Sequence, residues 1–185
     1  MRAFWVLILV LVTVPTSAIS WEQEALTQFR AILSCKNCDL TEANLVRADL
    51  RSAILVGSDL SRTNFYYAIL IGADLSQTIL DEVNLIGANL FIARLENARA
   101  VGAVMKGANL ANSQLSRADL RKADLRGGNL FNSIMKDVNL LGANLASASL
   151  HRADLTGAKI TRAALEAAHL CQTIMPDGQL NDRDC

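Results

Sequence analysis

The sequence predicts a solenoid built almost entirely of short extended segments and turns. Leucine recurs at residue numbers divisible by five from Leu40 to Leu170, and the residue two positions before it is nearly always small. A five-residue period scatters apolar side chains around an α-helix and alternates them between the faces of a flat strand. A chain that turns a corner every five residues instead points the leucine and the small residue inward. Such units bury their apolar sides by stacking on one another.

The repeated unit also carries a resemblance to a known family. Its copies include Ala48-Asp49-Leu50, Ala73-Asp74-Leu75, Ala88-Asn89-Leu90, Ala118-Asp119-Leu120 and Ala143-Asn144-Leu145. The run resembles the pentapeptide-repeat family over about 27 units, from Cys38 to Gln172. The resemblance implies an all-β solenoid, a right-handed quadrilateral β-helix with four pentapeptides per coil and about seven coils. Asp or Asn before the leucine is typical of turns, because these side chains bond nearby backbone groups.

Residues 1–18 are predicted to be a secretory signal peptide that is removed after Ala18 or Ser20. Arg2 supplies a positive charge, residues 3–14 are apolar and uncharged, and Pro15 with the small residues after it ends the segment. A membrane-spanning helix needs about 20 apolar residues, more than this segment offers. We therefore expect no membrane span after signal cleavage, with an uncleaved anchor as the alternative.

Residues 19–37 are predicted to form an N-terminal cap, with a helix from about Trp21 to Leu33. Apolar residues recur there at helical spacing, and Ser20 with Gln23 forms a capping box. The first coil of a solenoid exposes unpaired backbone and the open end of the core, which this helix is expected to cover. The polar face of the helix is not basic enough to favour a membrane-surface role.

The four cysteines lie in pairs at the two ends of the repeats. Thiols behind a signal peptide become oxidised, so we expect one disulfide between Cys35 and Cys38 and another between Cys171 and Cys185. A thiol redox protein that uses Cys35 and Cys38 is the alternative. No βαβ pattern surrounds these two residues, which argues against it.

Residues 173–185 leave the repeat and are predicted to form a C-terminal cap closed by the second disulfide. Met175-Pro176-Asp177-Gly178 is typical of a turn. We expect Ile174, Met175 and Leu180 to pack on the final coil. This tail and the Cys-x-x-Cys-Asp-Leu opening resemble exported cyanobacterial members of the family, which implies a periplasm or a thylakoid lumen.

The sequence predicts no catalytic, metal or cofactor site. His151 and His169 are the two histidines, and stacking places Cys171 about 5 Å, one strand spacing, from His151. Cys171 already has an expected disulfide partner, nothing orients the imidazole, and a convex rod offers no pocket. The chain is therefore predicted not to be an enzyme.

A candidate interaction patch emerges when the sequence is folded at a period of 20 residues. Apolar residues then stack across one corner of the first three coils: Val46, Tyr66, Tyr67, Ile69, Ile71, Ile86, Phe91 and Ile92. Two interpretations remain open. Ladders of aromatic and β-branched side chains stabilise β-structure by themselves. Exposed apolar patches also dock a protein partner or a second copy of the chain. The oligomeric state stays open.

Charge sets further bounds on function. The chain has 18 basic and 18 acidic residues, which predicts no pull on nucleic acid. Eight acids and four bases lie between Asp39 and Glu96, whereas five acids and ten bases lie between Arg99 and Glu166. This polarity is either incidental or a means of electrostatically steered docking.

Taken with the export signal, these features predict a non-enzymatic exported protein that acts as a rigid protein-binding or structural module. The alternative is a DNA mimic that inhibits or protects a type II topoisomerase, as some members of the family do. The neutral charge and the signal peptide disfavour this role.

Overall fold

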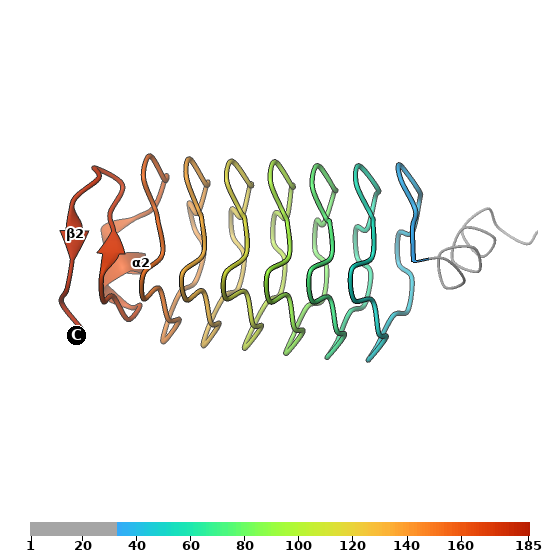
Figure 1. Ribbon diagram of the computed structural model, residues 1–185, viewed down its shortest axis with the longest axis horizontal. Helices are drawn as coiled ribbons and strands as arrows, with labels where there is room; N and C mark the ends of the chain where they lie inside the picture. The colour runs from blue at the N-terminus through green and yellow to red at the C-terminus, as the bar shows by residue number, and fades with distance from the viewer. Residues whose placement is uncertain (1–32) are drawn as a thin grey trace, which may run out of the picture.

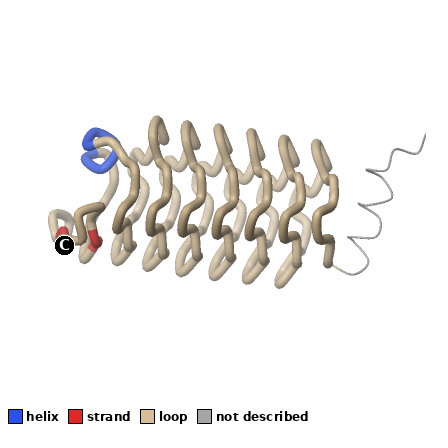
Figure 2. Tube along the Cα trace, turned by 90° about the horizontal axis from the view of Figure 1, so that it is seen from above, coloured by secondary structure: helices blue, strands red, loops and turns tan. Residues whose placement is uncertain are grey.

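The computed structural model describes residues 33–185, which wind into a rod of stacked coils (Figures 1 and 2). Except at Asn144, the residue before each leucine position forms a parallel bridge with the residue 20 positions later, from Ser34 with Ile54 to Asp154 with Ile174. Twenty residues contain four five-residue units, so each coil has four sides. The stacked solenoid predicted from the leucine period is therefore confirmed. The predicted signal peptide and most of the predicted N-terminal helix lie outside the described residues.

Most corners of the rod are turns with the same hydrogen bonds. Ala68 N–H donates to the carbonyl oxygen of Phe65 within one turn at 2.9 Å, and Leu70 N–H donates to Asn89 in the next coil at 2.7 Å. The side chain of Asn89 accepts from Phe91 N–H at 3.2 Å, and other Asp and Asn side chains repeat this contact. The turn role predicted for Asp and Asn before the leucine is confirmed.

The core is a closed stack of leucines and small residues. Leu90 and Ala88 are fully buried, and Phe65 is the largest fully buried side chain. Serine or threonine replaces the small residue at some positions. Each such hydroxyl donates to a backbone carbonyl oxygen, as Thr63 does to Leu40 at 2.7 Å. No buried side-chain nitrogen or oxygen atom in the described part of the chain lacks a partner. The side chains available to other molecules therefore stand on the outer surface.

One side of the last full coil is helical instead of extended. Helix α2 (Arg162–Glu166) begins after Thr161, whose hydroxyl accepts from Ala164 N–H at 3.2 Å. Other units without Asp or Asn at the position of Ala164, such as those of Ile54 and Ile69, stay extended. The alanine-rich sequence of this unit favours a helix. The five-residue phase continues beyond α2, because Ser149 still pairs with His169. The repeat predicted over residues 38–172 thus departs from the β-helix around α2.

A hairpin closes the C-terminal end of the rod. Strands β1 (Thr173–Ile174) and β2 (Leu180–Asn181) pair antiparallel, and both predicted disulfides, Cys35–Cys38 and Cys171–Cys185, are formed. Met175 packs against the core as expected. The expectation for Leu180 is wrong, because its side chain is 61% exposed. The chain reverses after β1, so β2 lies on the outside of the stack.

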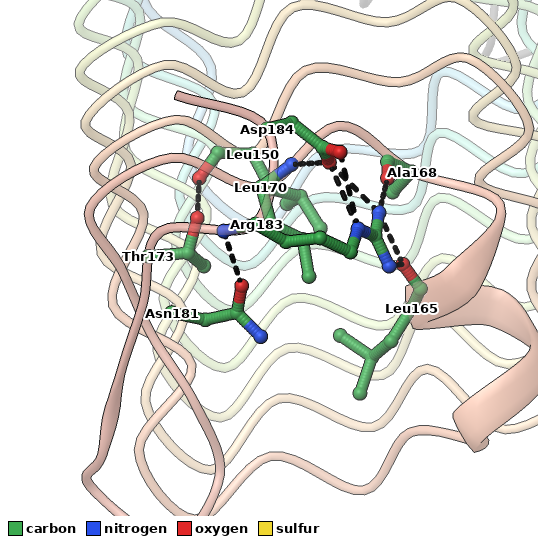
Figure 3. A network of polar contacts seen from close by, with 8 residues as sticks. All are labelled: Leu150, Leu165, Ala168, Leu170, Thr173, Asn181, Arg183 and Asp184. Carbon is green, nitrogen blue, oxygen red and sulfur yellow. Dashed lines mark hydrogen bonds and ion pairs between the residues drawn. The ribbon is translucent and has the colours of Figure 1, made fainter.

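Arg183 and Asp184 bind the free backbone groups of the last coil (Figure 3). The Arg183 guanidinium donates to the carbonyl oxygens of Leu165 and Ala168. Asp184 accepts from Leu170 N–H at 2.7 Å through its carboxylate and donates its own N–H to Leu170 O at 2.7 Å. A following coil would make these bonds in an endless solenoid. The tail therefore protects the exposed edge against pairing with another chain.

Asp184 makes this closure sensitive to acid. The hydrogen bond from Arg183 and then the one from Leu170 N–H lower the pKa of Asp184 from its ordinary 3.8 to about 2. A carboxyl group with a lowered pKa stabilises the fold above pH 3.8, and this contribution is lost as the pH falls to about 2. Asp184→Asn is expected to lower the unfolding midpoint in urea at neutral pH, with the gap from wild type closing as the pH falls to about 2. A gap that stays constant with pH contradicts this assignment.

Candidate interaction surface

The described residues contain few groups arranged for chemistry. All four cysteines are in disulfides, and no cluster of three or more His, Cys, Asp or Glu within residues 33–185 could hold a metal ion. Among these residues, no helix has both the length and the apolarity needed to cross a lipid bilayer. An open pocket of about 370 Å³ lies beside the hairpin and is lined by Met175, Pro176, Asp177, Gln179, Leu180 and Asn181. None of these side chains is a nucleophile placed beside a base.

The structure stacks His151 and Cys171 in adjacent coils, as the 20-residue period requires. Arg152 N–H, next to His151, donates to the carbonyl oxygen of Cys171 at 2.8 Å. The Cys171 sulfur atom is bonded to Cys185. A Cys-His pair that shares a proton therefore does not form in this state.

All eight residues of the candidate patch lie together on one face of the rod. Arg47 N–H bonds Tyr66 O and Tyr67 N–H bonds Ile86 O, so Val46, Tyr66 and Ile86 stack at one corner. At the next corner Gly72 N–H bonds Phe91 O, which stacks Phe91 on Ile71 and places Ile92 beside it. Ile69 lies on the side between the two corners, paired with Asp49 and Asn89. We call this side, with its two corners, the patch face.

The apolar side chains of the patch face lie flat against neighbouring coils. Tyr67 is 52% exposed, and its ring covers Gly87, where an added Cβ atom would lie 2.7 Å from a ring carbon. Ile92 reaches the equivalent glycine, Gly72, with its terminal carbon 3.8 Å from such a Cβ position. The rings of Tyr66 and Tyr67 meet edge to face, with centroids 4.5 Å apart. The two corners thus present packed apolar side chains, and on the side that joins them Ile69 stands between Asp49 and Asn89.

Sequence reasoning missed one aromatic residue of the patch face. Phe131 occupies the same corner as Phe91, two coils further along, and carries the Arg152 guanidinium 5.8 Å from its ring centroid. Extending the 20-residue column of Phe91 past Ala111 would have found it. Other exposed apolar residues stand singly on the remaining sides: Ile54, Ile79, Ile134 and Leu141.

The side between the two corners becomes polar toward the C-terminus. Asn109 donates its side-chain amide to Asn89 at 3.1 Å, and Asn129 donates to Asn109 at 3.3 Å. These ladders bond the coils to one another and replace the apolar contacts around Ile69. The apolar patch is therefore concentrated in the first coils.

Comparison with known proteins agrees with this architecture. A family model described as pentapeptide repeats matches residues 34–65, 58–91, 93–127 and 129–162. Among solved structures, the chain is similar to HetL, a pentapeptide repeat protein involved in heterocyst differentiation regulation in the cyanobacterium Nostoc sp. strain PCC 7120. The identity is 31%, over 80% of this chain and 89% of HetL, with a TM-score of 0.43.

Two further solved structures share the repeat at lower identity. QnrB1, a plasmid-mediated fluoroquinolone resistance protein, is 19% identical over 77% of this chain and 72% of its own, with a TM-score of 0.42. A pentapeptide repeat protein from the Arabidopsis thaliana thylakoid lumen is 19% identical over 82% of this chain and 88% of its own, with a TM-score of 0.34. A comparison with curated proteins finds no match.

Proposed function

Because the chain belongs to the pentapeptide-repeat family, whose members form right-handed β-helical solenoids, we propose that it is a non-enzymatic, rigid binding module for another protein. The contact surface is the patch face. The stacked coils hold its apolar side chains in a fixed arrangement, so little conformational entropy is lost when a partner docks.

The observation that carries this proposal is the apolar patch around Tyr66, Tyr67, Phe91 and Ile92. Ladders that only stabilise a β-helix need not collect on one face, yet here both corners of a single face carry aromatic residues. Tyrosine and phenylalanine are enriched at the centres of protein interfaces. Large contiguous apolar patches are rare on proteins that act alone.

We further propose that the protein is exported to a periplasm or a thylakoid lumen. The composition of residues 1–18 supports this, and so do the two disulfides, since such bonds persist in oxidising compartments. The proposed organisation is a signal peptide (1–18), an N-terminal cap (19–37), the repeat (38–172) and a C-terminal cap (173–185).

The two alternative functions have less support. Cys35, which would be the redox partner of Cys38, is only 6% exposed. A reactive cysteine needs to be accessible, so the pair is better suited to a structural role. A DNA mimic presents dense negative charge, whereas this chain mixes both signs and has no net charge.

Photo-crosslinking from position 67 tests the proposal. We expect the exported protein with p-benzoyl-phenylalanine in place of Tyr67 to give a discrete protein adduct in its native compartment. The same probe at Ser116, which stacks on Glu96 at the diagonally opposite corner, is the control. Phe91→Ser in the Tyr67 probe protein is expected to abolish the adduct. Equal adduct patterns from positions 67 and 116 contradict a binding role for the patch face.

A further inference from the structure

The patch face carries nearly all of its charge with one sign. Between residues 46 and 152 its two corners and the side between them hold these cations: Arg47, Arg51, Lys106, Arg126 and Arg152. Between residues 46 and 152 the same columns hold one acidic residue, Asp49, which pairs with Arg51 at 3.5 Å. Glu166 follows in the column of Lys106, within α2, where it bonds Arg162. The whole chain, in contrast, has equal numbers of acidic and basic residues. Basic residues are therefore in excess on the patch face, although the whole chain has no net charge.

The cations are placed at the edges of the apolar patch. Gly87 N–H bonds Lys106 O and Gly107 N–H bonds Arg126 O, so these residues continue the corner formed by Tyr66 and Ile86. Arg47 and Arg51 lie at the other end of the patch, in the coil of Val46. Lys106 and Arg47 make no ion pair with another described residue, whereas Arg126 bonds Asp124 on the adjacent side at 2.6 Å.

Acidic residues of the same coils lie across the rod. The sides follow one another in chain order, so the side of Asp39 and Asp59 is opposite the side of Ile69. Glu42 and Glu82 occupy a corner of that opposite side, two coils apart. Of the nearer carboxylates, Asp49 pairs with Arg51 on the patch face, and Asp124 on the adjacent side bonds Arg126 and also attracts Lys106. Glu42 and Glu82, in contrast, are separated from Lys106 and Arg47 by the core.

We propose that the patch face docks an acidic protein surface that has an apolar centre. This inference rests on the proposed binding function and adds the chemistry of the partner. Carboxylates of the partner meet Lys106 and Arg47 at the rim, while its apolar residues cover Tyr66, Tyr67 and Phe91. Charges at the rim of an interface steer association and select the partner, and the apolar centre supplies most of the affinity.

A second copy of the chain does not fit this face. In a two-fold dimer the same patch meets itself, because residue i of one copy contacts residue j of the other and the reverse. With the axis at the patch centre, Arg47 and Arg51 of one copy approach Lys106 and Arg126 of the other. Like charges placed across an interface cost free energy, so this pairing is disfavoured.

A lipid surface fits less well than an acidic protein. Interfacial anchors insert their apolar groups about 5–10 Å into the bilayer. Tyr67 and Ile92 instead lie flat against Gly87 and Gly72. Basic segments that bind anionic lipids hold about four to eight clustered lysines and arginines, whereas the cations here are spread over several coils.

The proposal is tested by reversing one rim charge in the protein that carries the photo-crosslinking probe at position 67. Lys106→Glu is expected to lower the yield of the adduct about tenfold at low salt, because repulsion replaces attraction at the rim. Lys122→Glu is the matched control. Lys122 is also exposed at a corner without an ion pair to a described residue, but at the corner of Glu42 and Glu82. This variant has the same net charge and is expected to keep the full yield.

The crosslinked partner peptide, identified by mass, supplies a second test. Lysine in place of an aspartate or glutamate beside the crosslink is expected to restore the yield with Lys106→Glu. Equal yields from the two charge-reversal variants overturn the proposal of an acidic partner, while the binding function stands. An adduct with a lipid or with a second copy of the chain also overturns the proposal of an acidic protein partner. Absence of any adduct from position 67 overturns the binding function and this inference together.

Discussion

Phe65→Ala is expected to lower the free energy of unfolding by about 3–5 kcal/mol. Phe65 is 0% exposed and occupies a leucine position of the core. Its own N–H donates to Asn84 in the next coil at 2.8 Å. The backbone ladder holds the neighbouring coils in place, so they cannot move in to fill the space that the ring leaves. The loss therefore includes both the lost burial of the ring and the cavity that remains.

Phe91→Ala is the matched control, because the same side chain is removed from the outer surface. Phe91 is 37% exposed, and we expect its loss to cost about 1 kcal/mol or less. Urea unfolding followed by circular dichroism measures both variants. Similar losses for the two phenylalanines would contradict the assignment of Phe65 to the core and Phe91 to a binding surface.

The second large effect is expected when the C-terminal disulfide is removed. Replacement of Cys171 and Cys185 together by serine is expected to lower the free energy of unfolding by about 3 kcal/mol, since the disulfide closes a loop with a sequence separation of 14. Cys185 follows Asp184 and Arg183, which bond the last coil. Loss of the disulfide also frees these residues, so the edge of the last coil becomes accessible to other chains.

Two measurements check this expectation. Urea unfolding gives the lost stability, and size-exclusion chromatography at rising protein concentration reports end-to-end association. Replacement of both Cys35 and Cys38 by serine is the control. Their sequence separation is only 3, so the expected loss is about 2 kcal/mol. If the C-terminal variant has the same unfolding midpoint in urea as the wild type, the capping role of the Cys171–Cys185 disulfide is contradicted.

The fold is well suited to the proposed binding function. Each leucine and each small residue points into a core whose described buried polar side chains are all hydrogen-bonded. The side chains that face solvent are the two residues of each corner and the residue before each leucine position on the sides. A corner residue such as Tyr67 meets its equivalent 20 positions away, which builds ladders of contact surface and no deep cleft.

Much of this protein follows from the sequence by itself. The five-residue leucine period determines the stacking, and Asp or Asn before the leucine, where present, bonds the turn that follows. Because neither depends on distant segments, the corner positions of Tyr66, Tyr67 and Phe91 could be predicted from numbering alone. The disulfides could be predicted for the same reason, since each joins cysteines close together at one end of the rod.

Only the tertiary structure decided the features that depend on where the repeat fails or on what lies across the rod. Helix α2 forms because the alanine-rich unit around Ala164 has a helical preference, which the five-residue period does not show. Leu180 is exposed because the chain reverses after β1, and Arg183 reaches carbonyl groups 15 and 18 residues away. The excess of positive charge on the patch face likewise emerges only when the four sides are placed in space, since Glu42 and Glu82 lie across the core from Lys106 and Arg47.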